Sequence, residues 1–307
     1  MGRYVLRRLL HLVPVFFGAT FLIYMLVWLV PGDPLAGKCG DKPCSDAYRE
    51  LLTHQFNLDK PWYEQYFIYM KNLLQGDFGL TMSQQPISEI ILHAYPNTAK
   101  LAFVALCVEG LIGVTAGVLT GLRRNGFLDN LVLISTLFLL AVPTFVTAYV
   151  LQYIFTSKLH LANATVADGK LSEMIMPGFV LGSVSMAYIA RLARTSIAEN
   201  RRSDYVRTAI AKGLPMRRVV GIHLLRNSLI PVVTYLGTDL GALMGGAIVT
   251  EGIFNIQGIG NQVYQAIVRK ESTTVVSIVV VLVMVYLLMN LLVDLLYAAL
   301  DPRIRYE

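Results

Sequence analysis

The stretch "VSIVVVLVMVYLLMNLLVDLLYAA", residues 276–299, indicates the class of this protein, and Asp294 is its only charged residue. A helix needs about 20 mostly apolar residues to cross the hydrocarbon core of a membrane. This run is therefore long enough to span a bilayer. Five earlier runs have similar length and character: 9–30, 99–122, 131–155, 174–193 and 229–250. The sequence predicts an all-α membrane protein with six transmembrane helices.

The composition supports this class, because hydrophobic residues make up 55% and charged residues only 15% of the 307 residues. The first apolar run follows Arg7 and Arg8, as in a secretory signal peptide. It is longer than the apolar core of a signal peptide, which is about 7–15 residues, and no small-residue cleavage site follows it. We therefore expect residues 1–30 to be a retained N-terminus and first span.

Arginine and lysine residues in the short loops predict the orientation, because such loops are enriched in positive charge on the cytoplasmic side. These residues are Arg3, Arg7, Arg8, Arg123, Arg124, Arg201, Arg202, Arg207, Lys212, Arg217, Arg218, Arg226, Arg303 and Arg305. Both termini are then cytoplasmic, and 31–98, 156–173 and 251–275 lie outside. Topology explains the net charge of +6, so nucleic-acid binding is not needed to account for it.

The domain organisation follows from this topology. Residues 31–98 form an extracytoplasmic segment, and the aromatic, weakly helical pattern "PWYEQYFIYMKNLL" (61–74) indicates a small folded cap after the first helix. Residues 99–299 contain helices 2–6, and 300–307 form a cytoplasmic tail. Cys39 and Cys44 lie in the outer segment, where disulfides persist, so either a disulfide or two free thiols is expected. Cysteine and histidine spacing indicates no metal site.

The polar stretch "SDYVRTAIAKGLPMRRVVGIHLLRN" (203–227) interrupts this apolar chain within the cytoplasmic loop 194–228. Ser203 or Asp204 can cap a short helix that carries Val206 and Ile210 one turn apart with Ala209 beside them, and Gly213 can end it. Pro215 can begin a second helix. Such a basic amphipathic element suits either an anionic lipid surface or a groove on a cytoplasmic partner.

Several motifs carry a resemblance to a known family. "YIARLARTSIAENRRSDYVRTAIAKG" (188–213) resembles the signature loop of binding-protein-dependent ABC transporter permeases, in the branch that imports dipeptides and oligopeptides. The chain resembles the first of the two permease subunit types in that branch. Further similar motifs occur in the same order: "PGDP" (31–34), "QGDFGLTM" (75–82), "GVTAGVLTGLRRNGFLDN" (113–130), "VPTF" (142–145), "LLRNSLIPV" (224–232) and "NLLVDLLYAALDPRIR" (290–305).

The resemblance implies a type I importer permease of the bacterial cytoplasmic membrane. Its partners would be a sister permease, cytoplasmic ATPase subunits and an extracytoplasmic peptide-binding protein. The chain has no G-x4-G-K-[ST] phosphate loop. It is therefore expected to be no enzyme and to hold no cofactor, with ATP and Mg²⁺ bound by the ATPases. Relatives in this branch also carry nickel chelates, opines or sugars.

The resemblance assigns ATPase coupling to one short segment. In such permeases the loop sits in a cleft of the ATPase, so that closure of the ATPases moves the spans. The positions implied here are Asp204, Tyr205, Val206, Arg207, Thr208, Ala209, Ala211, Lys212 and Gly213.

Two carboxyl groups inside predicted spans are candidates for the substrate path, because ionisable groups in a bilayer are costly and usually face the protein interior. Asp239 lies midway along the fifth span and Glu109 in the second. Either could meet the ammonium end of a peptide, or could form structural hydrogen bonds across the bundle. Glycines recur at every fourth position at Gly113, Gly117 and Gly121 and again at Gly237, Gly241 and Gly245. Each stripe predicts a close helix contact, either within this chain or with another subunit.

The predicted outer segment "EGIFNIQGIGNQVYQAIV" (251–268) is too short for another crossing. We expect its tip to help gate substrate or contact the binding protein, through Phe254, Asn255, Ile256, Gln257, Gly258, Ile259 and Gly260. A secondary transporter is the main rival class, although the two halves of the chain show no internal repeat.

Overall fold

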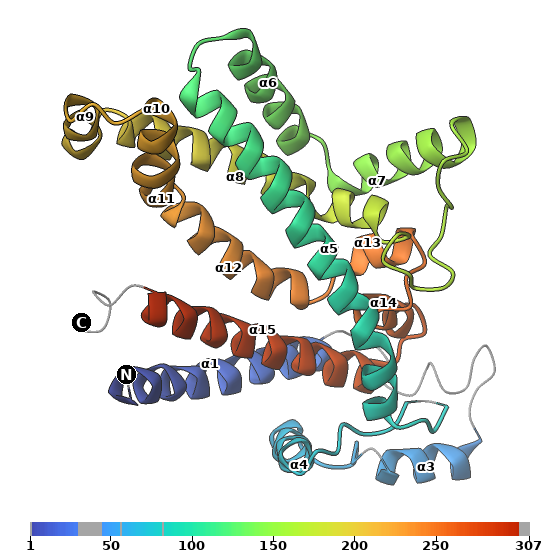
Figure 1. Cartoon of the computed structure of the whole chain (residues 1–307). Helices are drawn as coiled ribbons and strands as arrows, with labels where there is room; N and C mark the ends of the chain where they lie inside the picture. The colour runs from blue at the N-terminus through green and yellow to red at the C-terminus, as the bar shows by residue number, and fades with distance from the viewer. Residues whose placement is uncertain (1, 30–44, 56, 82, 301–307) are drawn as a thin grey trace. The chain divides into compact units, whose positions relative to one another are not determined.

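The computed structural model describes residues 2–29, 45–55, 57–81 and 83–300 (Figure 1). Its regular elements in these ranges are helices, with one isolated bridge between Leu80 and Pro86. Cys39, Cys44, Arg303 and Arg305 lie outside the described residues. The predicted all-α class is confirmed for the part of the chain that is described.

Four helices are long and apolar enough to cross a membrane, or up to six segments if each of two bent helix pairs is one span. The four fall within α1 (Gly2–Leu29), α5 (Ile87–Leu122), α8 (Ile175–Asn200) and α15 (Ser272–Leu300). The bent pairs supply the third and fifth predicted spans. The number of expected crossings is therefore reproduced only if the bent pairs are counted.

The third predicted span, 131–155, is sharply bent. It consists of α6 (Phe127–Ala141), α7 (Thr144–Gln152) and a π-helical turn, η1 (Tyr153–Lys158), and the break between α6 and α7 turns the chain by 105°. Val142 is extended there, with ψ 126°, and Pro143 precedes α7. Proline disfavours helical geometry in the residue before it and has no N–H to donate. The "VPTF" motif is thus the physical cause of the bend.

The fifth predicted span, 229–250, ends earlier than expected. The segment α10 (Met216–Arg218), η2 (Val219–Leu224) and α11 (Leu225–Ser228) leads into α12 (Ile230–Met244) with a bend of 45°. Gly246 then adopts φ +93°, which ends the helix, and α13 (Ile248–Ile253) follows. A positive φ is easily adopted only by glycine.

The chain divides into two compact units, and α5 supplies residues to both. The first contains the described residues of Met1–Thr98 and Gln257–Glu307. Within it α1 packs along α15, as Figure 1 shows, and α14 (Ile259–Val268) packs on α15. The segment after α1 contains α3 (Asp46–Gln55) and α4 (Trp62–Leu74). The helical pattern predicted for 61–74 is therefore confirmed.

Aromatic and apolar side chains join α4 to α1 and α15. Tyr66 and Met70 of α4 form a buried cluster with Val276 and Val280 of α15. The Tyr66 hydroxyl lies 3.0 Å from the Thr20 hydroxyl of α1. The first unit thus has a core of its own.

The second unit, Ala99–Ile256, is organised around α8, which contacts α6, α7, α11, α12 and α13. The predicted glycine stripe of α5 also meets α8. A Cβ atom on Gly117 would lie 2.5 Å from the Ala193 Cβ and 2.6 Å from the Ala190 carbonyl oxygen, and Gly113 is similarly crowded by Ile189. The stripe is therefore used for packing within the chain, which glycine allows because the backbones approach closely.

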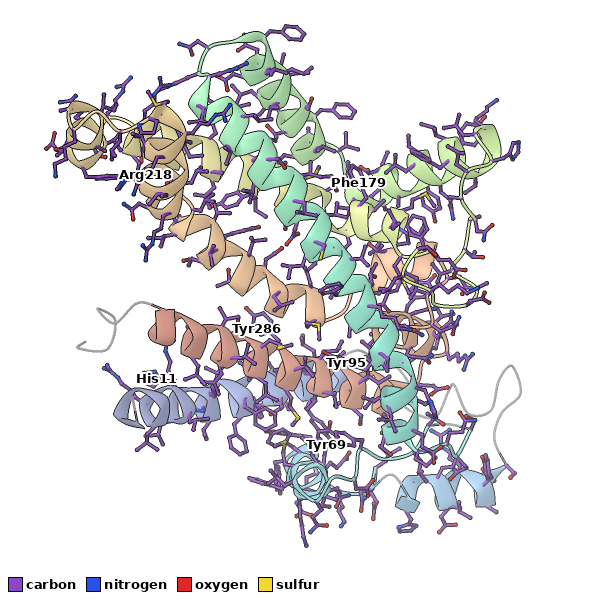
Figure 2. All side chains as sticks on the ribbon, viewed as in Figure 1. His11, Tyr69, Tyr95, Phe179, Arg218 and Tyr286 are labelled. Carbon is purple, nitrogen blue, oxygen red and sulfur yellow. The ribbon has the colours of Figure 1, made fainter. Side chains whose placement is uncertain are left out.

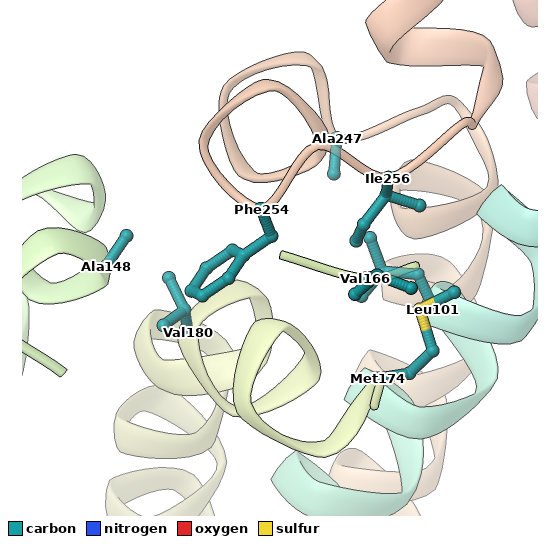
Figure 3. Close-up of a cluster of buried hydrophobic side chains, with 8 residues drawn as sticks. All are labelled: Leu101, Ala148, Val166, Met174, Val180, Ala247, Phe254 and Ile256. Carbon is teal, nitrogen blue, oxygen red and sulfur yellow. The ribbon is translucent and has the colours of Figure 1, made fainter. Parts of the chain in front are cut away.

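A second cluster of buried side chains holds the segments after α7 and α13 against α5 and α8. Figure 3 shows the Phe254 ring directed toward Val180, with Val166, Leu101 and Met174 grouped near Ile256. The Val166 amide also donates to the Phe254 carbonyl oxygen at 2.9 Å. Phe254 consequently anchors the end of α13.

Candidate functional site

The polar loop after α8 folds as two short helical segments joined by a tight turn. The first is α9 (Asp204–Ala211), and the second is the segment 216–228. Gly213 has φ +75° and its amide donates to the Ile210 carbonyl at 2.9 Å, so it ends α9 as predicted. Ser203 occupies the N-cap position, but its hydroxyl donates to the Asn200 carbonyl and the predicted side-chain cap is not formed.

An apolar base fixes α9 to the rest of the second unit. Val206 and Ala209 are 2% and 5% exposed, and they cluster with Ile197 of α8 and with Val219 and Leu224 of η2. Ile210 instead points outward and is 49% exposed. The predicted apolar stripe is therefore confirmed for Val206 and Ala209 and wrong for Ile210, because residues three apart share the inward face here.

The remaining residues implied in coupling form an exposed face on α9. They are Asp204, Tyr205, Arg207, Thr208, Ala211, Lys212 and Gly213. The second segment adds exposed basic side chains, including Arg218, which Figure 2 labels. This face combines positive charge with apolar contributions from Ile210 and Met216, which is 60% exposed. Such a surface suits a groove in a partner with complementary charge.

A buried ion pair stands at the base of this loop. The guanidinium of Arg194 on α8 makes two bonds to the carboxylate of Asp129 on α6, with N···O distances of 2.5 and 2.8 Å. The Asn125 amide donates to the same carboxylate at 2.8 Å, and Asp129 is 1% exposed. Two parallel N–H···O bonds give this pair a defined geometry. A small cavity of about 170 Å³ beside it is lined by Arg124, Arg194, Thr195, Ala198, Glu199 and Arg202.

The two carboxyl candidates of the predicted substrate path come together in the second unit. Glu109 of α5 is fully buried, and Asp239 of α12 is close enough for the two charges to interact. Within the described residues, neither oxygen of Glu109 has a hydrogen-bond partner, and Oδ2 of Asp239 has none. A Cβ atom on Gly182 of α8 would lie 3.0 Å from the Ala105 carbonyl oxygen and 3.3 Å from Glu109 Cβ, so glycine allows α8 to approach α5 closely beside this carboxyl.

Two tyrosines lie beside this pair. The rings of Tyr188 on α8 and Tyr235 on α12 have centroids 4.5 Å apart, and the Tyr235 hydroxyl donates to the Ser185 hydroxyl at 3.3 Å. Tyr235 lies close enough to both carboxyl groups to interact with them. The result is a polar cluster among otherwise apolar helices, and such a cluster can receive a cation or a hydrogen-bond donor.

The candidate outer gate is more buried than a flexible gate would be. Phe254, Ile256 and Ile259 are at most 1% exposed, and Gly258 and Gly260 are also buried. Asn255, at φ +49°, and Gln257 are exposed. Gln257 belongs to the first unit, where its carbonyl accepts a bond from the Asn97 side chain at 2.9 Å. Most of these residues hold the turn in place, and two present side chains at its surface.

Comparison with known sequences decides the family. Residues 113–306 match the family described as "binding-protein-dependent transport system inner membrane component", and residues 1–102 match the corresponding N-terminal family. The chain belongs to this family. It is therefore a multi-pass membrane permease component and not an enzyme, and the resemblance inferred from its motifs is confirmed.

The permease also has full-length relatives. It is 34% identical to the di/tripeptide transport system permease protein DppB of Pseudomonas aeruginosa and 35% identical to the dipeptide transport system permease protein DppB of Alkalihalophilus pseudofirmus. It is 35% identical to the glutathione transport system permease protein GsiC of Escherichia coli strain K12. Each match covers 100% of both chains.

Sequence reasoning missed one buried residue of the permease, Asp129. The signal was present, because Asp129 is a single carboxylate at the start of an apolar run and follows Arg123 and Arg124. Its partner Arg194 lies 65 residues away, so the pair became visible only in the packed structure. In the described part of the chain, no group of three or more His, Cys, Asp or Glu side chains is placed to hold a metal ion.

Proposed function

We propose that this permease is one of two membrane subunits of an ATP-driven importer of short peptides. The curated relatives are named for dipeptide, tripeptide and glutathione transport, and glutathione is itself a tripeptide. The observation that carries the coupling role is the exposed face of α9, which is held rigidly from behind by Val206 and Ala209. A rigidly backed, exposed helix is suited to transmit force from a partner.

The arrangement in the cell follows from charge and family. The basic loops and both termini face the cytoplasm of a bacterium, and the segment containing α3 and α4 forms an extracytoplasmic cap. A sister permease completes the translocation path, cytoplasmic ATPase subunits bind ATP and Mg²⁺, and an extracytoplasmic binding protein delivers the peptide. This chain needs no cofactor for its own part.

The contacts of α9 suggest how closure of the ATPases reaches the spans. Val206 and Ala209 pack on Ile197 of α8 and on Val219 and Leu224, which precede α12. A displacement of α9 therefore acts on α8 and α12 together. These two helices carry Tyr188, Tyr235 and Asp239, so the same displacement reshapes the polar cluster around Glu109 and alternates its access.

The central test uses a position on the exposed face. The tagged chain is purified from native membranes in mild detergent, its co-purifying subunits are identified by mass spectrometry, and the complex is reconstituted with the binding protein. We expect Ala211→Trp to reduce ATPase retention or peptide-stimulated ATP hydrolysis about tenfold or more, because the indole fills the face that docks. Ala211→Ser serves as the matched control, since it leaves the helix surface almost unchanged.

The choice of position matters because Ala209 is buried. A bulky residue at Ala209 would disturb the packing of the apolar base. Loss of the ATPase in that variant could then result from misfolding as well as from lost docking. The proposal fails if the unmodified chain purifies without an ATPase and moves peptides in liposomes without ATP. That result would indicate a secondary transporter, and the basic loop would then be a lipid-binding element.

A further inference from the structure

The first unit contains a polar cavity that the coupling role does not use. Its volume is about 430 Å³, within the range of about 300–1,000 Å³ typical of small-ligand sites. It is lined by residues from the 79–87 loop, the first turns of α5, the turn at Gln257, α14 and the start of α15. All of these segments belong to the first unit and to parts of the chain expected outside the membrane or at its outer border. Tyr95, labelled in Figure 2, marks the stretch of α5 concerned.

The cavity is rich in carboxamide side chains. Five of its lining residues are amides: Gln85, Asn97, Gln257, Gln262 and Gln265. A carboxamide offers both a donor and an acceptor. Amides therefore match the alternating N–H and C=O groups of a peptide backbone, whatever side chains the peptide carries.

Two opposite charges complete the lining. Glu89 lies in the first turn of α5, and Arg269 follows the last residue of α14. Among the described residues, neither takes part in an ion pair. The other acidic group of the cavity, Glu271, is 8% exposed and accepts a bond from the Thr274 hydroxyl at 2.8 Å. An exposed carboxylate and an exposed guanidinium thus line the same cavity as five amides, together with the imidazole of His93.

Hydrogen bonds hold the walls of the cavity together. The side-chain amide of Asn97 donates to the Gln257 backbone carbonyl at 2.9 Å, and the backbone amide of Ile259 donates to the Thr98 hydroxyl at 2.8 Å. These two bonds connect the start of α14 to α5. The Ile87 amide donates to the Gly79 carbonyl at 3.1 Å, which closes the 79–87 loop. A preformed site loses less entropy when it binds a ligand.

We propose that this cavity is a reception site for a short peptide with free termini, in which Glu89 meets the α-ammonium, Arg269 meets the α-carboxylate, and the amides bind the backbone between them. This inference rests on the proposed peptide-import function and assigns a site for the cargo on the outer side. A loop of the binding protein could pair with Glu89 and Arg269 only if it placed two side chains of opposite charge there, whereas every short peptide with free termini carries both charges. The cavity chemistry therefore favours the free peptide over a protein loop.

The experiment uses the assembled transporter in nanodiscs without its binding protein. The probe is a dipeptide of alanine and photo-leucine, and cross-linked fragments are located by mass spectrometry. We expect labelling within residues 79–97 or 257–274, and protection by excess unlabelled dialanine. N-acetyl-dialanine and dialanine amide should each protect about twofold to fivefold less well, which is the effect of losing one exposed ion pair.

Charge variants assign each terminus to its residue. Arg269→Gln should remove the difference between dialanine and dialanine amide, while the penalty for N-acetylation remains. Glu89→Gln should do the reverse. Lys71→Gln on α4 is the matched control, because it removes an exposed charge of the same unit away from the cavity.

The outcomes separate this inference from the proposed function. ATP-driven uptake of radiolabelled dialanine is measured in proteoliposomes that contain the binding protein. Labelling outside the cavity, or equal protection by free and capped peptides, overturns the reception site, and normal uptake in that case leaves peptide import intact. Labelling confined to the cavity, with the two charge-specific losses, supports the site. A complete absence of ATP-driven uptake for any peptide would instead refute the import function.

Discussion

Asp129 and Glu109 are two buried carboxyl groups of the second unit that differ in their surroundings. The Asp129 carboxylate accepts hydrogen bonds from Nε and one terminal nitrogen of Arg194 and from the Asn125 backbone amide. Glu109 is equally buried but has no hydrogen-bond partner among the described residues, and its charged neighbour is a second carboxyl group, Asp239. A buried charge is tolerated when it is paired, and an unpaired one is costly.

The difference indicates different roles. Asp129 joins α6 to α8 next to the loop that carries α9, so its pairing is structural. Glu109 retains acceptor capacity inside the bundle, where a structural residue would have been satisfied or replaced by an apolar one. Unsatisfied groups persist where a ligand or a conformational change supplies the missing partner, and we therefore propose that Glu109 and Asp239 lie on the transport path.

The largest loss of stability is expected from breaking the ion pair between Asp129 and Arg194. Asp129→Ala leaves the Arg194 charge buried without its partner, so we expect a loss of about 3–5 kcal/mol of stability. Thermal unfolding of the assembled complex, followed by fluorescence-detected size-exclusion chromatography, measures this loss. The double variant Asp129→Leu with Arg194→Met should recover much of it. Equal stability of Asp129→Ala and the unmodified chain would contradict the structural role.

At Glu109 we expect the opposite pattern, in which stability is kept and peptide uptake falls. Glu109→Gln replaces a buried carboxyl group that has no hydrogen-bond partner among the described residues, so stability should be unchanged or higher. Peptide uptake in proteoliposomes should fall about tenfold or more, because a hydrogen bond to a charged group contributes about 1.5–3 kcal/mol. Asp239→Asn should act in the same direction while assembly and basal ATP hydrolysis persist. Normal uptake of every tested peptide by both variants would remove these residues from the transport path.

The smallest effect is expected at a partly exposed pair. Arg8 of α1 and Asp294 of α15 lie 3.0 Å apart, with side chains 45% and 28% exposed. A pair in such a setting contributes about 0.2–1 kcal/mol. Asp294→Asn should therefore lower the unfolding temperature only slightly, in the same chromatographic assay. A loss as large as that of Asp129→Ala would show that burial does not separate the two pairs.

Much of the architecture could be predicted from local patterns. The apolar runs, the helix at 61–74, the end of α9 at Gly213 and the contact made by Gly117 were all visible in the sequence, because each depends on residues that are near in the chain. The break at Pro143 could also have been predicted, since proline constrains its predecessor, but the angle of 105° depends on how α7 packs on α8 and α13.

The candidate sites also combine features visible in the local sequence with features that depend on the packing of distant residues. The sequence marked the polar loop, but the choice of Ala209 over Ile210 as the inward residue depends on where Ile197 and Leu224 lie. The pairing of Asp129 with Arg194, the approach of Glu109 to Asp239 and the gathering of five amides around one cavity join residues far apart in the chain.

By itself, then, the sequence determined the membrane class, the family and the location of the polar loop 203–227, because hydropathy, charge and motifs are properties of short segments. Only the tertiary structure decided which buried polar side chains have hydrogen-bond partners, as Asp129 does, and which have none among the described residues, as is the case for Glu109. Satisfaction of a buried charge is a property of distances between helices, and no local pattern encodes it.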